Sequence, residues 1–480
     1  MVLEVIASKE IKIMEKKLVY DIQDKPPIGK IIVFALQQLL AIIAATILVP
    51  KLVGNGMSTS AALLGAGVGT LVYQLFTKFR SPVFLGSSFA FIGSMSAAFA
   101  GAYATKDIGY LGILIGAIFA GLMYVIIALI IKFVGVKWIN KLMPPAVIGP
   151  TVALIGLSLA TNAVRNSLSI TDNAVVSPYP SSLNLWLSFI CAMVTFFVVI
   201  ICSTYGKKMV KLIPFIIGIL AGYGLALIFT AIGHISGVED FIIVNFQPFK
   251  DLVANGVNVS TFIEIPEFTF IKAFKGFKDF EWSYLATIAV AYIPVAFVVF
   301  AEHVADHKNL STIVGKDLLD DPGLHRTLLG DGIGSMAGAF FGGCPNTTYG
   351  ESVGCVAITR NASIVTITTT SIIAILISFL SPFVALLDTI PACVIMGGVC
   401  IALYGFIAVS GLKMIQKISL ENSANLFTVS AILITGIGGM AFTIADKVTI
   451  TPVACALILG IIVNIVLNIK KNDDDKENKE

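Results

Sequence analysis

Two short stretches of the chain carry carboxylates in otherwise apolar surroundings. The first is "GGCPNTTYGESVGC", residues 342–355, in which Glu351 lies among glycines, hydroxyl side chains and a proline. The second is "VVFAEHVADHKN", residues 298–309, in which Glu302 follows an apolar run. An ionisable side chain inside a membrane is costly and is by default a candidate for function. Carboxylates in such a place can accept hydrogen bonds from a ligand or carry a proton.

The second stretch has the spacing of a proton carrier. Glu302 and Asp306 are four residues apart and share one face of a helix. Two nearby carboxylates in a medium of low dielectric constant favour protonation of one of them. His303 and His307 share the adjacent face and are further candidates for proton transfer, the alternative being that they are surface residues at a helix end.

Composition places these residues in a membrane protein. Of 480 residues, 57% are hydrophobic and only 13% are charged, whereas an average soluble domain is about 25% charged. The mean hydropathy is +0.93. The N-terminus carries charges throughout and lacks the apolar region of a cleavable signal peptide. The seven cysteines show no C-x-x-C spacing, so we expect neither a metal site nor a disulfide framework, and no cofactor.

The apolar runs predict fourteen transmembrane spans, each long enough to cross or enter about 30 Å of hydrocarbon. They are residues 31–53, 59–77, 84–100, 109–134, 142–163, 184–204, 212–234, 283–305, 326–342, 346–359, 361–380, 391–412, 423–443 and 450–469. With both termini in the cytoplasm, the inner loops hold sixteen Lys and Arg residues and the short outer loops only four. This asymmetry is the positive-inside pattern of a multi-pass protein of the cell membrane.

The chain also shows an internal duplication. "PPAVIGPTVALIGL" at 144–157 opens the fifth span, and "IPACVIMGGVCIALYG" at 390–405 opens the twelfth, which is the fifth span of the second half. The third span, with "SPVFLGSSFAFIG" at 81–93, and the tenth are both short and broken. Seven spans per half place the second copy upside down in the membrane. The fold class is therefore an all-α polytopic protein with a 7+7 inverted repeat, and broken helices in such repeats commonly mark the substrate site.

The broken spans explain why the polar stretch exists. Irregular backbone at membrane depth is tolerated only where protein, water or a ligand pairs its polar groups. Half-helices beginning near Tyr349 and near Ser88 and Phe89 would aim their N–H groups at the centre of the bilayer, which by itself suits an anion. Glu351 changes this expectation, because a carboxylate accepts hydrogen bonds from ligand N–H groups. A neutral ring that alternates N–H and C=O groups, such as a uracil-like ring, fits better.

Several segments together resemble the nucleobase–ascorbate transporter family, also called nucleobase cation symporter family 2, and within it the bacterial uracil permeases. The matching pieces extend over nearly the whole membrane region. They are "QQLLAIIAATILVP" (37–50), "LGSSFAF" (85–91), "FAEHV" (300–304), "KDLLDDPGLHR" (316–326), "PNTTYGESVGCVAITR" (345–360) and "ALYG" (402–405).

The resemblance implies a core domain, a gate domain and a homodimer formed through the gate. The implied parts are a cytoplasmic N-terminal segment (1–30), core spans (31–134), gate spans (142–234), an extracellular loop (235–282), core spans (283–380), gate spans (383–470) and a cytoplasmic tail (471–480). It further implies uracil:proton symport, with the core moving against the gate in an elevator-like way.

The resemblance also implies which residues hold the substrate. Glu302 and Glu351 would bind it, and Tyr349 and Gly350 would contribute beside the latter. The backbone at Phe89 and the side chain of Tyr404 complete the implied set.

Two residues depart from the uracil permease pattern. Asp306 stands where these permeases commonly have a His, and an acid there resembles the purine-transporting branch. Ser352 stands where Asn is usual. The purine branch typically carries Gln at the position of Glu351, so the signature is mixed. His307 lies one residue beyond Asp306, which turns it by about 100° on a helix.

Three other functions remain as alternatives. A xanthine or other purine permease is motivated by Asp306, and an anion transporter of similar fold by the paired helix ends. A membrane enzyme is disfavoured, because the sequence offers no nucleophile–base pair, metal cluster or phosphate-binding loop.

Overall fold

The computed structural model describes residues 18–102, 105–135, 143–168, 183–207, 209–254, 256–444 and 448–477, and this part of the chain is mostly helical. Eight helical stretches within it are long and apolar enough to cross a membrane. They are α2 (Ile28–Val53), α3 (Thr59–Phe76), α5 (Lys106–Val134), α7 with α8 (Pro145–Ser158 and Ala160–Ser167), α9 (Leu183–Tyr205), α11 (Pro214–Ser236), α15 (Trp282–Val314) and η4 with α20 (Cys393–Val399 and Cys400–Ile415).

Shorter elements occupy the remaining predicted spans. They are α16 (Leu324–Gly342), α18 (Ile364–Ser378), α21 (Ser423–Ile437), α22 (Pro452–Glu477) and two strand–helix units, β1 with α4 (Leu85–Ser87 and Ile92–Ala100) and β2 with α17 (Asn346–Thr348 and Gly350–Thr359). Each predicted span therefore coincides with one of these elements. The all-helical multi-pass architecture is confirmed, while the number of full crossings stays a prediction.

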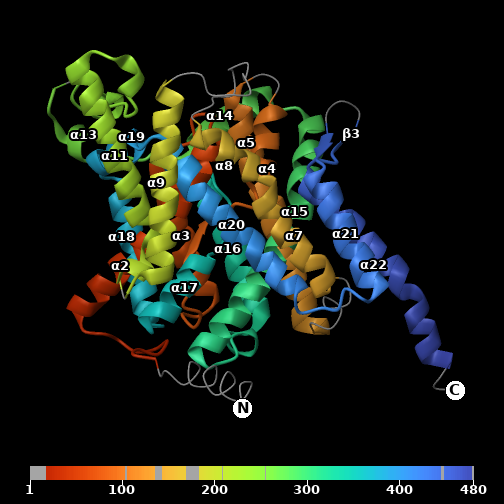
Figure 1. The fold of residues 1–480 in the computed structure, drawn as a ribbon. Coiled ribbons are helices and arrows are strands. Elements are labelled where there is room, and N and C mark those ends of the chain that lie inside the picture. The colour runs from red at the N-terminus through yellow and green to blue at the C-terminus, as the bar shows by residue number, and fades with distance from the viewer. Residues whose placement is uncertain are drawn as a thin grey trace.

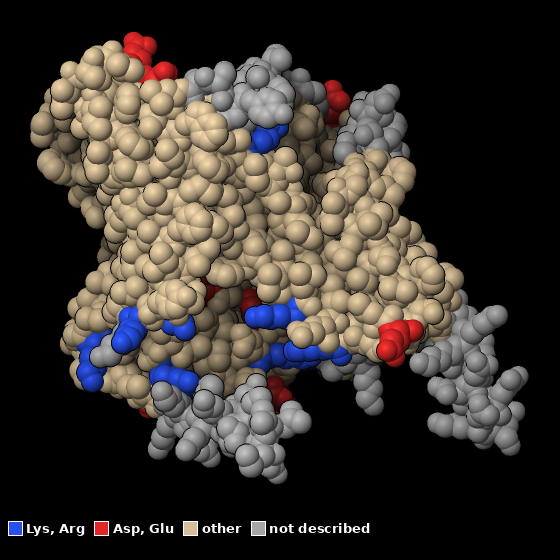
Figure 2. Space-filling model, viewed as in Figure 1, with Lys and Arg blue, Asp and Glu red and all other residues tan. Residues whose placement is uncertain are grey.

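The helices form one bundle in which α2 begins and α22 ends at the lower side (Figure 1). Figure 2 shows a broad uncharged band around the middle of the molecule, with Lys and Arg gathered near the lower end, where the surface is hollowed. An apolar band between charged ends is the surface of a protein embedded in a bilayer.

The two broken spans meet as a short antiparallel strand pair. β1 pairs with β2 in the register Leu85↔Thr348, Gly86↔Thr347 and Ser87↔Asn346. The Ser88 N–H continues the pairing by donating to the Pro345 carbonyl at 2.9 Å. Each strand is followed by its own short helix, and Figure 1 shows α4 in the upper half of the molecule and α17 in the lower half, as the antiparallel pairing requires. This arrangement is what the predicted inverted repeat requires of its third and tenth members.

Close helix packing supports the strand pair from one side. α3 and α16 meet through glycines, so closely that a Cβ on Gly65 would lie 2.5 Å from the Gly338 oxygen and 2.9 Å from Gly342 Cα. A Cβ on Gly334 would lie 2.7 Å from the Gly69 oxygen. Small residues four apart allow such backbone contact between membrane helices, where dispersion forces rather than the hydrophobic effect hold them together.

Contacts divide the helices into two groups. In the first, α3 and α5 pack on α16, α18 packs on α2 and α3, and α15 packs on α5. In the second, α7 packs on α20 and α21, α9 packs on α11 and η4, and α21 packs on α22. These groups follow the order expected for a core and a gate, although the domain division itself stays a prediction.

The polar connection before α15 is folded in its described residues. It forms η1 (Glu239–Phe241), α12 (Gln247–Val253), α13 (Val259–Phe262), α14 (Thr269–Gly276) and η2 (Phe277–Asp279). α12 and α13 pack on α19 (Ser381–Thr389), which joins the two groups of helices. The connection thus covers the joint between the groups.

The glycine contact between α3 and α16 predicts the effect of one added methyl group. Gly65→Ala forces the two backbones apart, and overpacking of this kind costs about 1–3 kcal/mol. We expect a lower melting temperature of the detergent-solubilised protein. Gly224→Ala in α11 is the matched control, since a Cβ there meets no atom within 4 Å and Ala favours the helix by about 1 kcal/mol. Equal melting temperatures for the two variants would contradict the packing argument.

Candidate functional site

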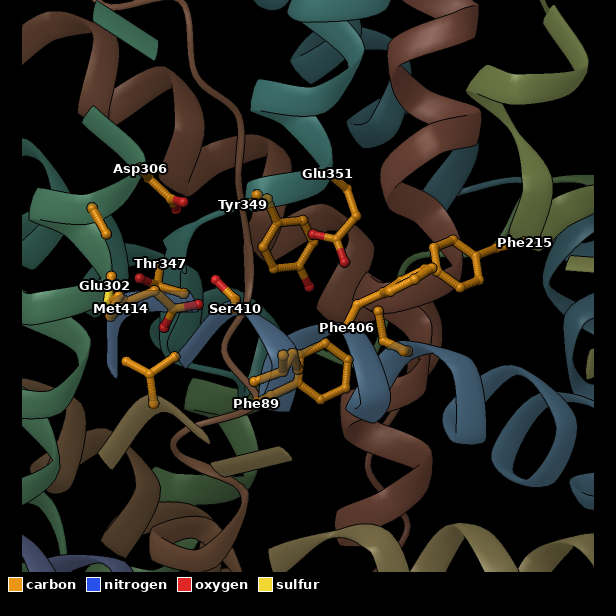
Figure 3. Close-up of a pocket in the computed structure, with 15 residues that line it drawn as sticks. Phe89, Phe215, Glu302, Asp306, Thr347, Tyr349, Glu351, Phe406, Ser410 and Met414 are labelled. Carbon is orange, nitrogen blue, oxygen red and sulfur yellow. The ribbon is translucent and has the colours of Figure 1, made fainter. Parts of the chain in front are cut away.

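A cavity of about 290 Å³ lies where α15, β2 and α17 face α11 and α20. Three carboxylates reach it, and Figure 3 shows them approaching from different sides of the cavity. The lining residues are Phe89, Val152, Phe215, Glu302, Ala305, Asp306, Thr347, Tyr349, Gly350, Glu351, Leu403, Phe406, Ile407, Ser410 and Met414. Concave sites with few, converging polar groups are the usual form of a small-molecule site.

α15 contributes two of the carboxylates from one face. Glu302 and Asp306 both line the cavity one helical turn apart, as their spacing predicts. The Thr348 hydroxyl, buried at the end of β2, donates a hydrogen bond to Asp306 Oδ2 at 2.8 Å. A charge-assisted hydrogen bond of this kind fixes the direction of the carboxylate. Asp306 is thus tied to the broken tenth span.

The third carboxylate sits in the first turn of α17. Tyr349 is the N-cap residue, Gly350 begins the helix, and Glu351 follows. The first N–H groups of a helix have no partner within it and carry partial positive charge. The first turn of α17 therefore offers the cavity a hydrogen-bond acceptor, the Glu351 carboxylate, together with backbone N–H donors.

Tyr349 connects the two broken spans through its side chain. Its side chain is buried, and its hydroxyl donates to the Ser87 carbonyl at 2.7 Å. Its ring covers Gly86 so closely that any Cβ there would collide with it. The position of Tyr349, and with it the start of α17, is therefore set by β1.

Ser352 also connects separate segments of the chain. In the sequence it stood out only as a departure from the uracil permease pattern. Its buried hydroxyl oxygen accepts from Gln38 Nε2 at 2.5 Å and from the Phe84 N–H at 3.0 Å. Gln38 comes from α2, and Phe84 precedes β1. Three separate segments thus meet directly behind Glu351. A buried glutamine in an apolar run was the signal for Gln38, which sequence reasoning did not single out.

Aromatic side chains from both halves of the chain close the cavity. Phe89 lines it, and Tyr404 lies behind Phe89 with the two ring centroids 6.1 Å apart in an edge-to-face arrangement. Phe215 and Phe406, which were not anticipated, also line the cavity and form another edge-to-face pair with ring centroids 6.1 Å apart. The α20 wall repeats every three or four residues, at Leu403, Phe406, Ile407, Ser410 and Met414, which is the spacing of one helix face.

The two histidines face away from the cavity. His303 Nδ1 lies 2.8 Å from Asp331 Oδ2, and its Nε2 lies 2.9 Å from the Thr327 hydroxyl. His307 Nε2 lies 2.8 Å from the Tyr73 hydroxyl, and the two imidazole rings stack at 4.1 Å. Both histidines are fully buried, so the interpretation that they are surface residues is wrong. Their part in proton transfer stays a prediction.

The described residues contain no group of three or more His, Cys, Asp or Glu side chains arranged to hold a metal ion. The cavity's chemistry consists of carboxylates, helix-end N–H groups and aromatic rings. Such a set can bind a flat polar molecule and exchange a proton.

Comparison with known proteins identifies relatives along almost the entire chain. A family model described as "Permease family" matches residues 29–445. A uracil permease of Bacillus caldolyticus is 40% identical over 454 residues, which is 94% of this chain and 95% of the relative. A uracil permease of Bacillus subtilis is 39% identical over 463 residues, covering 96% and 97%.

Solved structures share the fold at low sequence identity. The transmembrane domain of the cyanobacterial bicarbonate transporter BicA superposes with a TM-score of 0.57 at 14% identity, covering 90% of this chain and 96% of that domain. The murine anion transporter Slc26a9 in its inward-facing state superposes with a TM-score of 0.62 at 12% identity, covering 94% and 69%. These likenesses establish the fold alone.

The Ser352 contacts predict that a small change behind the cavity destabilises the protein. Ser352→Ala leaves the Gln38 amide and the Phe84 N–H without their acceptor, which costs about 1–3 kcal/mol for buried groups. The melting temperature in detergent should fall. Ser410→Ala, at an exposed hydroxyl on the α20 wall, should stay within about 0.5 kcal/mol of the wild type. A Ser352→Ala protein as stable as Ser410→Ala would show that the contact does not hold α17 in place.

Proposed function

Because the chain belongs to the nucleobase–ascorbate transporter family, we propose that this multi-pass permease imports uracil together with protons. The observation that carries the proposal is the convergence of Glu302, Asp306 and Glu351 on one cavity at the start of a half-helix. Permeases are transporters, which agrees with the expectation that the chain is not an enzyme.

Uracil matches the polar groups of the cavity. Its two ring N–H groups would donate to the carboxylates of Glu302 and Glu351. Its carbonyl oxygens would accept from the N–H groups at the start of α17, next to Gly350, and from the backbone at Phe89. Each such hydrogen bond to a charged group is worth roughly 1.5–3 kcal/mol. The Phe89 ring, backed by Tyr404, would pack against the flat substrate, and Tyr349 would shape the floor.

Proton coupling follows from the crowding of carboxylates. Three like charges around a poorly solvated cavity repel one another, and a proton bound with the neutral substrate relieves that repulsion. Glu302 and Asp306 are the proposed carriers, since they are one turn apart on α15. The Thr348 hydroxyl donates a hydrogen bond to Asp306, which keeps the Asp306 carboxylate turned toward β2.

The cavity walls suit an elevator-like movement. The carboxylates belong to α15 of the first group and to α17, which packs on α2 and α15 and so joins that group. Phe215, Phe406 and Met414 belong to α11 and α20 of the second group. Sliding the first group past the second would carry the substrate across while the second stays in place. Helix α19 joins the groups: Lys51 at the end of α2 pairs with Asp388 at 3.3 Å, and the Tyr223 hydroxyl of α11 lies 2.7 Å from the Thr389 hydroxyl.

The proposed membrane is the cell membrane, with the basic lower end and both termini in the cytoplasm. The gathering of Lys and Arg near that end supports this orientation (Figure 2). The hollow at the same end would then open the cavity to the inside. A homodimer through the second group of helices is part of the proposal and rests on the family likeness.

A purine such as xanthine is the second candidate substrate. Asp306 favours it, because an acid at this position resembles the purine-transporting branch. Glu351 favours uracil, since that branch typically has Gln there. An anion fits poorly, because the three carboxylates would repel it.

Substitutions of the two glutamates have different expected effects on uracil binding and uptake. Glu302→Ala should abolish uptake of radiolabelled uracil into proteoliposomes, since it removes a charged hydrogen bond worth about 10- to 100-fold together with a proton carrier. Glu351→Gln should retain measurable uracil binding with altered selectivity, because an amide oxygen still accepts a hydrogen bond. Glu421→Gln, at an exposed residue outside the cavity, is the matched control and should transport normally.

Melting temperatures of the purified wild-type protein test which nucleobase it binds. Uracil and 5-fluorouracil should raise the melting temperature of the purified wild type, and xanthine should not. Full uptake by Glu302→Ala would remove the proposed role of Glu302. Stabilisation by xanthine alone would make this protein a purine permease.

Proton coupling predicts that a pH gradient drives accumulation. With pH 6 outside and pH 8 inside, wild-type proteoliposomes should concentrate uracil above its external level, and a protonophore should abolish the gain. Asp306→Asn or Glu302→Gln should bring the uracil level only to equilibrium or abolish uptake, since each removes one proposed carrier. Asp317→Asn, at an exposed residue beyond the end of α15, should accumulate uracil as the wild type does. Accumulation that ignores the pH gradient would exclude proton symport.

A further inference from the structure

The cavity has two chemically unlike ends. Glu302, Asp306 and Thr347 line one end, where Figure 3 also shows Met414, and Glu351 in the first turn of α17 lies between this end and the other. The other end carries the uncharged rings of Phe215 from α11 and Phe406 from α20. Figure 3 shows the Phe215 and Phe406 rings on the side of the cavity away from Asp306.

The cavity is larger than a single pyrimidine ring needs. Its volume of about 290 Å³ is close to the lower limit of the pockets that enclose drug-sized ligands, about 300 Å³. A uracil held against the carboxylates therefore leaves space next to the aromatic wall. The Phe406 side chain is 52% exposed, whereas Phe215 is 9% exposed, so Phe406 is the ring with most surface left to cover.

The chemistry of the ring decides which edge faces that space. The N–H and C=O groups of uracil follow one another from N1 to C4, and the C5–C6 edge carries only C–H groups. If the N–H groups face the carboxylates, the C5–C6 edge faces the aromatic wall. A hydrocarbon group on C5 would then bury apolar surface against Phe215 and Phe406, at about 25 cal/mol for each Å².

We propose that Phe215 and Phe406 form an apolar subsite that accepts a hydrocarbon substituent on C5 of uracil. This inference rests on the proposed uracil function and names a further ligand class for the same cavity: 5-alkyl and 5-benzyl uracils. The subsite lies between the two groups of helices, since Phe215 and Phe406 belong to one group and Glu351 to the other. A large substituent there wedges the groups apart, so these ligands bind and are not carried across.

The test compares binding and transport along a series of substituents. The ligands are uracil, thymine, 5-propyluracil and 5-benzyluracil. For each ligand we measure competition with radiolabelled uracil for the purified full-length protein and the change in the melting temperature of that protein. We expect 5-benzyluracil to bind at least as tightly as uracil, despite its greater size. In proteoliposomes preloaded with uracil, external uracil should exchange, and 5-benzyluracil should block exchange without entering.

Variants locate the subsite. Phe406→Ala should lower the affinity for 5-benzyluracil about ten-fold relative to that for uracil, because it removes the more exposed of the two rings of the subsite. Phe427→Ala in α21 removes a ring of similar exposure, 58%, outside the cavity and should leave the ratio unchanged. Phe406→Leu should restore part of the ratio.

The outcomes separate this inference from the proposed function. A steady loss of affinity with substituent size, an unchanged ratio in Phe406→Ala, or entry of 5-benzyluracil at the rate of uracil would overturn the subsite. Absence of any effect of uracil would overturn the proposed function instead. The subsite is then judged by the melting-temperature shift that 5-benzyluracil itself produces, which must still depend on Phe406.

Discussion

The structure depends on pairing the backbone where two membrane spans stop short. A chain inside a bilayer has no water to satisfy its N–H and C=O groups, and here the two interruptions satisfy each other through β1 and β2. The Ser88 N–H and the Tyr349 hydroxyl extend the pairing to neighbouring carbonyls. Because α17 begins directly after β2 at this junction, Gly350 and Glu351 in its first turn line the cavity. The proposed substrate site thus results from the way in which the chain pairs its interrupted backbone.

A second constraint falls on α15, which carries titratable groups on two faces. Glu302 and Asp306 face the cavity, while His303 and His307 are buried against α16 and α3 and hydrogen-bonded there. Burying an unpaired polar group costs several kcal/mol, so the histidine contacts fix how the helix is turned about its axis. That rotation determines where Glu302 and Asp306 point. Support and proposed chemistry are therefore carried by neighbouring residues on two different faces of α15.

Sequence patterns predicted the fold and the carboxylates because those signals contrast with their surroundings. Apolar length defined the spans, and Glu302 and Glu351 stood out as charges in apolar runs. Phe215 and Phe406 gave no such contrast, because in a membrane helix the side facing lipid and the side facing a cavity are both apolar. The contact between Gln38 and Ser352 joins residues 314 apart in the chain, which no local pattern reveals. The four-residue spacing of His303 and His307 predicted that they share one helix face, but the sequence did not indicate whether that face was buried.

The fold by itself does not select the substrate, and the proposed function assigns that selection to side chains of the cavity. Solved structures of the same fold include a bicarbonate transporter and an anion transporter, so a shared backbone accompanies different cargo. A helix start presents partial positive charge, which by itself suits an anion. In this chain Glu351 lies in the first turn of one of them, and Glu302 and Asp306 face it across the cavity. The acceptors outweigh the helix ends, so the site favours a neutral molecule with N–H donors over an anion. In the proposed function, selectivity therefore resides in side chains at the interruption, which can change while the strand pair next to the cavity stays the same.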